Sequence, residues 1–294
     1  MGIGADLRAQ LIGWTAPLTV SHHRGLDLAD GPLPPVVIRS VPTRHGSVRC
    51  RVQLPRTAQD APVVLHLHGG GFLMRYPQMD DFWTRFVADR CDAAVINVDY
   101  TAAPRARYPV AHEQVHDVAA WITEHADDWG LDRRRVAVTG FSAGGNLAAS
   151  ACLFLRDQGL QRPRLLVLGV PSLDVTTTDK PATASRPMVS PALLRLVRAT
   201  YFRDDSRRGE AHASPGLAPR LDGLPPTVVL TAQHDALRRE GDRFAARLAA
   251  AGLLRAHHVE ARRDHYVLQG GTHEAAIRME WMTDHLTAAL DVPA

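Results

Sequence analysis

The chain has 294 residues, of which 45% are hydrophobic and 22% charged, and its net charge is +3. This length suffices for one large hydrophobic core, and the weak, dispersed positive charge gives no indication of a nucleic-acid partner. Lys180 is the only lysine, so a phosphate-binding loop of the G-K-[ST] kind is excluded, and no motif implies a cofactor.

The first segment, residues 1 to about 35, is loosely amphipathic and precedes the first predicted strand. It contains no apolar run typical of a leader peptide, and no stretch of 18 apolar residues follows it. We therefore expect a cytoplasmic protein that does not insert stably into membranes.

Short β-rich segments then alternate with longer helical patterns. This alternation predicts a mostly parallel eight-stranded sheet with helices on both faces. The expected strands are Val36–Ser40, Val48–Leu54, Val63–His68, Ala93–Val98, Val136–Gly140, Leu165–Gly169, Thr227–Thr231 and His257–Glu260. The expected helices are Asp80–Arg90, Pro109–His125, Ala143–Asp157, Arg238–Ala251 and His273–Leu290.

Residues 176 to about 212 interrupt this alternation with proline-rich turns around one predicted helix, Pro191–Phe202. An insertion of this size late in an α/β sheet is expected to cover the carboxyl ends of the strands, where such sheets bind ligands. The rest of the chain shows no second core, so residues 1–294 are predicted to form a single domain.

A serine flanked by glycines lies between the predicted strand 136–140 and the helix 143–157. Gly140 and Gly144 stand two residues either side of Ser142, in the pattern G-x-S-x-G. A side chain at either glycine would collide with its neighbours in so sharp a strand-to-helix turn. The pattern alone has little specificity in a chain with 22 glycines, but the strand before it and the helix after it predict that Ser142 is a nucleophile.

Three consecutive glycines follow the strand that ends near Leu67, in the segment His68–Gly71. Consecutive glycines let the backbone approach a ligand closely and direct amide groups toward it. An oxyanion that develops during acyl transfer needs such fixed donors, and the helix after Ser142 adds the amide of Ala143. The segment therefore predicts an oxyanion-binding loop.

A serine hydroxyl becomes a good nucleophile only when a base removes its proton. Where a serine lies on such a turn, the expected chain order is Ser, then Asp or Glu, then His. Asp235 follows the strand 227–231, and His265 follows the strand that ends at Glu260. We predict that His265 accepts the proton of Ser142 and that Asp235 orients His265.

The segments His68–Phe72 and Gly140–Gly145 resemble the bacterial hormone-sensitive lipase-like esterases of the α/β-hydrolase superfamily. The resemblance covers roughly residues 60 to 290 and extends to the segments Asp99–Pro104, Tyr108-Pro109, Ser214-Pro215 and Asp235–Gly241. It implies an α/β-hydrolase fold whose helical cap combines residues 1–35 with 176–212. By the same resemblance, the oxyanion donors are the amides of Gly70, Gly71 and Ala143.

The resemblance also implies an activity. The expected protein is a serine carboxylic-ester hydrolase that acts through an acyl-enzyme on small-molecule esters with short to medium acyl chains. Related arylformamidases share the H-G-G-G segment and the serine turn, so an amide substrate stays open. A non-catalytic, ligand-binding relative is a further alternative, and whether the chain forms a homodimer is not decided by the sequence.

Two residues beside the predicted triad depart from the family pattern. Phe141 stands where the family commonly has Asp, and Tyr266 stands where Gly usually follows the histidine. Together with Phe72, they are predicted to line the substrate pocket. A bulky Tyr266 is expected to narrow that pocket or to reshape its loop.

The segment His112–His116 matches H-E-x-x-H, the pattern of zinc metalloproteases. The extended pattern asks for Gly and His where Ala119 and Ile122 stand. The helical phase places both histidines at the margin of the apolar stripe, so we expect a solvated helix flank and no metal. His66 and His68 alternate on one strand, and His68 is expected to brace the glycine loop instead of binding a metal.

Overall fold

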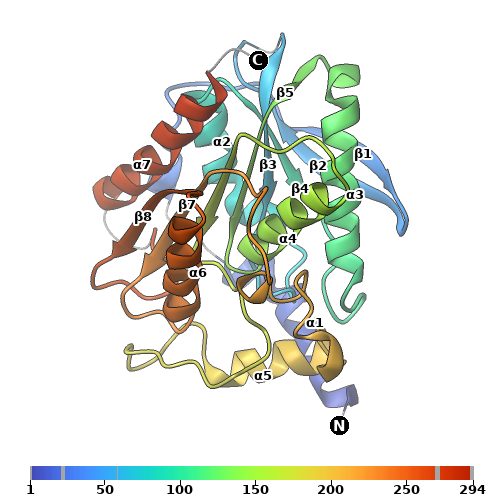
Figure 1. The fold of residues 1–294 in the computed structure, drawn as a ribbon, viewed down its shortest axis with the longest axis vertical. Coiled ribbons are helices and arrows are strands. Elements are labelled where there is room, and N and C mark those ends of the chain that lie inside the picture. Colours follow the sequence, from blue (N-terminus) through green and yellow to red (C-terminus); the bar gives the residue numbers. More distant parts are fainter. Residues whose placement is uncertain (1, 21–23, 58, 269–271, 292–294) are drawn as a thin grey trace.

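The computed structural model describes residues 2–20, 24–57, 59–268 and 272–291 (Figure 1). In these ranges the strands are β1 (Val37–Thr43), β2 (Gly46–Gln53), β3 (Ala61–Leu67), β4 (Ala94–Val98), β5 (Leu131–Phe141), β6 (Leu165–Gly169), β7 (Thr227–Ala232) and β8 (Leu254–Glu260). They form one sheet in the order β1-β2-β4-β3-β5-β6-β7-β8. The two pairings of β2, with β1 and with β4, are antiparallel, and all the others are parallel.

Helices cover both faces of this sheet. The helices of the described residues are α1 (Gly2–Thr19), α2 (Asp81–Arg90), α3 (Val110–His125), α4 (Ala143–Asp157), α5 (Pro191–Thr200), α6 (Arg238–Ala250) and α7 (Thr272–Leu290). Short 3-10 turns are η1 (Arg24–Leu26), η2 (Pro77–Asp80), η3 (Ala126–Trp129), η4 (Asp205–Arg207) and η5 (Pro215–Leu217). Apolar side chains of α3, α4 and α6 pack on one face, and those of α2 and α7 pack on the other. Strands buried on both faces read as near-continuous apolar runs, as the fully buried β3, β4 and β6 do, with His66 in β3 and Asn97 in β4 as interruptions.

The prediction of a mostly parallel eight-stranded sheet with helices on both faces is confirmed, and the predicted strands and helices all occur. The largest boundary difference is in β5, which begins at Leu131, ahead of the expected Val136. Its pairing with β3 shifts register between Pro62 and Val63, where Arg133 to Arg135 have no partner residue in β3. The irregular start of β5 could not be predicted from the sequence, because three consecutive arginines interrupt the apolar run.

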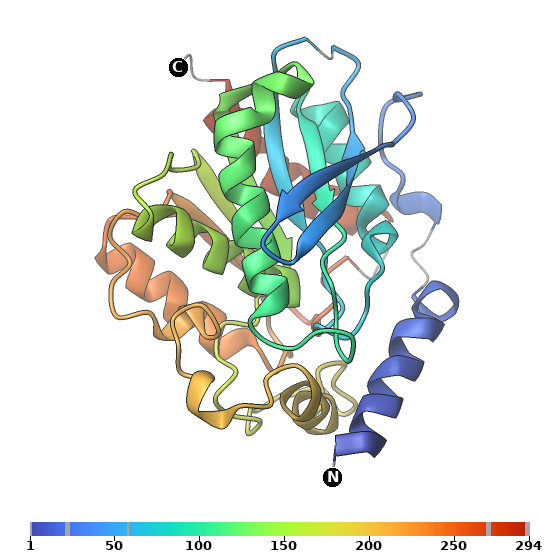
Figure 2. The same cartoon turned by 90° about the vertical axis from the view of Figure 1, so that its right-hand side faces the viewer.

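The first segment was expected only to be loosely amphipathic, and most of it is the helix α1. Figures 1 and 2 place α1 and α5 side by side at the lower end of the molecule, where they contact each other. Ala9 and Ala16 of α1 are buried. Its outward side is apolar and exposes the side chains of Ile3, Leu7, Leu11, Trp14 and Leu18.

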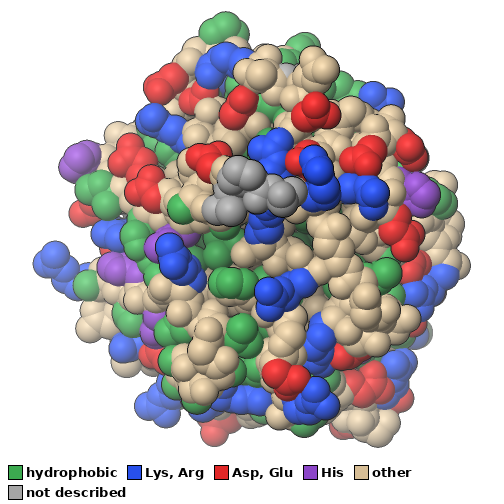
Figure 3. All heavy atoms as spheres, turned by 45° about the horizontal axis from the view of Figure 1, so that its top comes forward, with side chains coloured by type: hydrophobic (Ala, Val, Ile, Leu, Met, Phe, Trp, Pro, Cys, Tyr) green, Lys and Arg blue, Asp and Glu red, His purple; other side chains and the backbone are tan. Residues whose placement is uncertain are grey.

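The surface at the opposite end of the molecule is charged, unlike the exposed apolar side of α1. Figure 3 turns that end forward and shows basic and acidic side chains interspersed, without a large patch of one sign. Exposed ion pairs of this kind contribute only ~0–1 kcal/mol each, so the fold depends mainly on its two apolar layers.

Candidate active site

The turn between β5 and α4 holds Ser142 in a backbone conformation that non-glycine residues rarely adopt, with φ 56° and ψ −118°. The Ser142 amide donates to the Gly169 carbonyl at 2.9 Å, and its carbonyl accepts from the Ser172 amide at 3.0 Å. A β-carbon at Gly140 or Gly144 would overlap backbone atoms of the neighbouring turn or strand. These contacts explain why G-x-S-x-G is needed here, and they hold the serine at the carboxyl end of the sheet.

Three side chains from different loops meet at this turn. The Ser142 Oγ lies 2.8 Å from His265 Nε2, and His265 Nδ1 lies 2.8 Å from Asp235 Oδ2. Asp235 follows β7 and also accepts from the Leu237 amide at 3.1 Å. Asp235 is 3% exposed and His265 is 8% exposed, so the pair is largely shielded from water, and His265 lines the cavity. The structure thus brings together the three residues predicted from chain order.

The partners of His265 indicate where its proton lies. A carboxylate can only accept hydrogen bonds, so Nδ1 carries the proton and donates to Asp235. Nε2 is then free to accept the hydroxyl proton of Ser142. Both distances fall within the reach that proton transfer requires.

The segment after β3 folds back beside the serine. Gly70 and Gly71 have φ of 107° and 62°, and a β-carbon on Gly70 would press on the Met74 side chain. Within the described part of the chain, neither glycine amide donates a hydrogen bond. The amide of Ala143 opens α4, where the first turn of a helix leaves its donors without an internal partner. Free donors near Ser142 can stabilise a developing oxyanion.

His68 contacts this loop from inside. Its Nδ1 donates to the Gly69 carbonyl at 2.8 Å, and its ring stacks on Tyr100 with 4.3 Å between centroids. The Tyr100 hydroxyl donates to the His68 carbonyl at 2.8 Å. Burial lowers the pKa of His68 to about 4, so the ring is neutral at physiological pH. This geometry agrees with a role for His68 in bracing the glycine loop.

A cavity of about 450 Å³ opens above Ser142, between the sheet and the helices α1 and α5. Its lining is mostly apolar and includes the three residues predicted for the substrate pocket. Phe72 reaches it from the glycine loop and stacks on Tyr201 with 4.9 Å between ring centroids. Further side chains from the two helices are Ile12, Leu193, Leu194, Val197 and Arg198.

Phe141, which precedes the serine, fits against a glycine on the next strand. Its ring lies where a β-carbon of Gly169 would be, and its centroid is 5.4 Å from that of Trp83 and 5.5 Å from that of His66. Tyr266 is partly buried and packs against the same apolar layer. The two departures from the family pattern therefore both line the cavity and pack against the same apolar cluster.

Sequence reasoning missed the charged side chains that line the cavity, which are Asp80, Asp174, Lys180 and Arg198. Asp80, at the end of η2, and Lys180, in the segment before α5, both line it. Lys180 Nζ donates to the Asp174 carbonyl and to the carboxylate of Glu240, whose other oxygen accepts from the Leu173 amide at 2.8 Å. Burial raises the pKa of Glu240, and the Lys180 ammonium opposes that shift. A single lysine in an arginine-rich chain was the available signal for this buried ion pair.

The prediction that His112 and His116 lie on a solvated helix flank is wrong. His112 is fully buried and His116 is 4% exposed. His112 Nε2 lies 2.8 Å from Asn146 Oδ1, and His116 Nε2 lies 2.8 Å from Ser150 Oγ. The helix α4 presents these polar partners to α3, so histidines fit at a buried helix–helix contact.

The same contacts bear on the zinc pattern. Glu113 points elsewhere and lies 2.6 Å from His45 Nε2. His112 also bonds the Tyr201 hydroxyl at 3.0 Å, so both of its nitrogens have protein partners. Across the described residues, no group of three or more His, Cys, Asp or Glu side chains is arranged to hold a metal ion.

Acidification from pH ~7 to ~5 should lower the free energy of unfolding. Burial lowers the pKa of His68 to about 4 and of His112 to about 3, from 6.5, so only the unfolded chain takes up these protons at mild acidity. Between its pKa in the unfolded chain and its lower pKa in the folded protein, each such histidine lowers the free energy of unfolding by about 1.4 kcal/mol for every pH unit of acidification. Urea unfolding across this range should show a shallower pH slope for His112→Gln than for the wild type. Equal slopes would contradict the buried neutral state.

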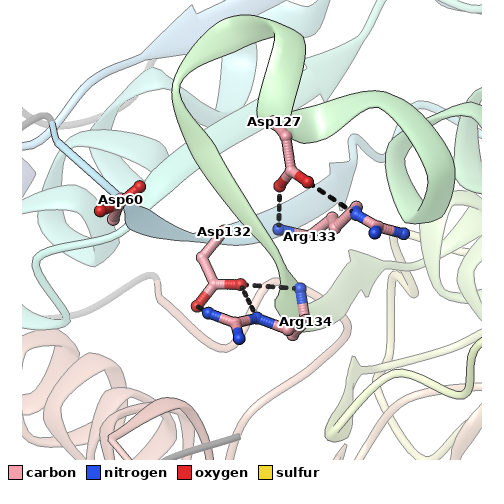
Figure 4. Close-up of a pocket in the computed structure, with 5 residues that line it drawn as sticks. All are labelled: Asp60, Asp127, Asp132, Arg133 and Arg134. Carbon is pink, nitrogen blue, oxygen red and sulfur yellow. Dashed lines mark hydrogen bonds and ion pairs between the residues drawn. The ribbon is translucent and has the colours of Figure 1, made fainter.

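A second cavity, of about 300 Å³, lies at the other end of β5 (Figure 4). Asp127 accepts from Arg133, and Asp132 accepts from Arg134. Asp60 also lines it. It contains no nucleophile and no histidine among its lining residues, so the site above Ser142 is the candidate active site.

Comparison with known proteins gives a consistent result. The family model described as alpha/beta hydrolase fold matches residues 64–269. Esterase LipI of Mycobacterium tuberculosis is 34% identical over 265 residues, which cover 87% of this chain and 83% of that protein. A solved esterase from Pyrobaculum calidifontis has a TM-score of 0.86 at 28% identity, covering 97% of this chain and 92% of the other. The carboxylesterase EstE1, cloned from a metagenomic library, has a TM-score of 0.82 at 28% identity, covering 99% and 97%.

Among the helices of the described residues, none is both long enough and apolar enough to cross a membrane.

Proposed function

Because this chain belongs to the α/β-hydrolase family and its relatives are esterases, we propose that it hydrolyses carboxylic esters through a covalent acyl-enzyme on Ser142. The observation that carries this proposal is the continuous hydrogen-bonded chain from Ser142 through His265 to Asp235. Ser142, the first member of this series, lies at a largely apolar cavity. Free backbone donors lie beside the serine, as acyl transfer requires.

In the first half-reaction, Ser142 Oγ attacks the ester carbonyl carbon while its proton moves to His265 Nε2. The negative charge that develops on the carbonyl oxygen is held by the amides of Gly70, Gly71 and Ala143. The imidazolium then gives its proton to the leaving alcohol oxygen as the carbon–oxygen bond breaks. The alcohol departs, and the acyl group stays on Ser142.

In the second half-reaction, water replaces the serine as the nucleophile. His265 Nε2 removes one proton from the water as its oxygen attacks the acyl carbon, and the same proton returns to Ser142 Oγ when the acid leaves. Asp235 stabilises the imidazolium in both halves, and its burial makes this charge interaction stronger than it would be in water. Net, one ester and one water yield one acid and one alcohol.

We assign the size limit of the substrate to a cap made of α1 and the segment around α5. Ile12 from α1 and Leu193 from α5 line the cavity on the side away from the sheet. A largely apolar space of about 450 Å³ accommodates short to medium acyl chains and leaves little room for long ones. The same space disfavours bulky, highly polar substrates.

A series of p-nitrophenyl esters tests this function directly. We expect kcat/KM to be highest between acetate and octanoate and to fall for palmitate. Release of p-nitrophenol, followed by absorbance, gives the rates, and N-formylkynurenine serves as the amide comparison. Faster turnover of the formamide than of every ester would replace the ester assignment with the amide alternative.

Tyr266→Gly should broaden the range of esters that the protein accepts. Tyr266 lines the cavity beside His265, so its removal frees volume next to the reacting carbonyl. One misfitting methylene in an apolar pocket costs ~10–200-fold in kcat/KM, so branched and longer acyl esters should gain roughly tenfold relative to butyrate. Tyr266→Phe keeps the ring and is the matched control. The same ester profile in wild type and Tyr266→Gly would show that Tyr266 does not limit the pocket.

A further inference from the structure

One side of the candidate pocket contains a buried carboxylate. Asp80 ends η2, directly before α2, and lines the same cavity as Ser142. It is 6% exposed, in a lining that is largely apolar but also includes Asp174, Lys180 and Arg198. Removing a carboxylate from water is costly unless other groups replace the lost hydrogen bonds.

The protein replaces only part of that hydration. His66 Nε2 lies 3.0 Å from Asp80 Oδ2, while His66 Nδ1 is engaged by the Thr139 hydroxyl at 2.8 Å. Asp80 does not use its side chain to cap α2. The contact with His66 reaches one carboxylate oxygen, Oδ2. An ionised carboxylate has about four acceptor positions, so this side chain retains capacity for a donor from the cavity.

Aromatic side chains line the same cavity as this carboxylate. Phe82 comes two residues after Asp80, and Phe141 lies against His66, which binds Asp80. Tyr266 belongs to the same lining, and burial together with the Asp80 charge raises the pKa of its hydroxyl.

We propose that Asp80, with Phe82, Phe141 and Tyr266, forms a subsite for a protonated amine carried by the ester substrate. This inference rests on the proposed ester hydrolysis at Ser142. A carboxylate accepts a charge-assisted hydrogen bond from an ammonium group, and aromatic faces attract the same cation. A neutral alkyl group of equal shape would add no donor to the one that His66 supplies. The subsite therefore selects amino esters over their hydrocarbon analogues.

Two pairs of isosteric esters test the selection on either side of the carbonyl. On the alcohol side, 3-(dimethylamino)propyl butyrate is compared with 4-methylpentyl butyrate. On the acyl side, p-nitrophenyl 4-(dimethylamino)butanoate is compared with p-nitrophenyl 5-methylhexanoate. In each pair a protonated nitrogen replaces one CH group, so shape is matched and only charge and hydrogen bonding differ. Rates are measured at pH ~7 by acid release in a pH-stat.

We expect the wild type to favour the amine in at least one pair by roughly tenfold or more in kcat/KM, the order set by a cation–π contact combined with a charge-assisted hydrogen bond. In Asp80→Asn, which keeps the shape and removes the charge, the preference should fall to about one. Asp81→Asn is the matched control, because its carboxylate pairs with Arg51 at 2.7 Å and does not line the cavity. That variant changes the net charge equally and should keep the wild-type ratio.

A measurement on the wild type alone tests the subsite even if Asp80→Asn does not fold. The alcohol 3-(dimethylamino)propanol should inhibit hydrolysis of p-nitrophenyl butyrate more strongly than 4-methylpentan-1-ol, if the amine site lies on the alcohol side. Equal rates within both ester pairs, or an amine preference that survives Asp80→Asn, would overturn the inference. Turnover of neutral esters without an amine preference would contradict the subsite alone. No turnover of any ester would contradict the proposed function itself.

Discussion

Replacing Ser142 with alanine should abolish ester hydrolysis while leaving the fold intact. Without Oγ no acyl-enzyme forms, and His265 loses the hydroxyl it activates at 2.8 Å. Loss of the nucleophile in serine hydrolases costs ~10⁴–10⁶ in kcat, and the residual rate comes from binding and the oxyanion donors. Alanine fits the position of Ser142, because the hydrogen bonds that hold this turn use only the serine backbone.

The comparison uses p-nitrophenyl butyrate, with thermal unfolding as the measure of folding. Ser206→Ala is the control, because Ser206 lies in η4, does not line the cavity, and uses its hydroxyl to bond the Asp204 carboxylate. That variant should retain wild-type rates. Turnover in Ser142→Ala within tenfold of the wild type would remove the serine from the mechanism.

Replacing Asp235 with asparagine should reduce kcat by about 10⁴-fold with a small change in KM. The carboxylate accepts the Nδ1 proton of His265 at 2.8 Å and stabilises the imidazolium that forms when Ser142 attacks. An amide at this position cannot supply the negative charge, and its NH₂ group favours the wrong tautomer of His265. Because the change is isosteric, the geometry of the loop after β7 is expected to persist.

The neighbouring acid provides the control for this variant. Asp264 precedes His265, but its carboxylate accepts from the Met188 amide at 2.8 Å and does not contact the histidine. Asp264→Asn should therefore lose far less activity than Asp235→Asn. Comparable losses in the two variants would mean that Asp235 has no special part in activating His265.

The sheet and the triad geometry could be predicted because each depends on local patterns. Apolar runs alternate with helical stretches, and parallel strands bring their carboxyl-end loops to one edge of the sheet. Asp235 and His265 therefore meet at Ser142 although 93 and 30 residues separate the three along the chain (235 − 142 and 265 − 235). Glycines in the turn are required by close backbone contacts, which a sequence pattern can record.

Features that depend on contacts between distant segments could not be predicted. The periodicity of α3 placed His112 at a polar margin, because a sequence alone does not show that Asn146 of α4 faces it. In the same way, nothing near Asp80 indicates that His66 binds it inside the pocket. Both are polar groups whose burial is possible only because a partner comes from another element.

The most direct test of acyl-enzyme formation is mass spectrometry after rapid acid quenching of wild type mixed with excess p-nitrophenyl butyrate. The account predicts one butyryl group per chain, on the peptide that contains Ser142, formed with a burst of p-nitrophenol and absent from Ser142→Ala. Steady turnover with the butyryl group on another residue, or an adduct of equal yield in Ser142→Ala, would contradict it.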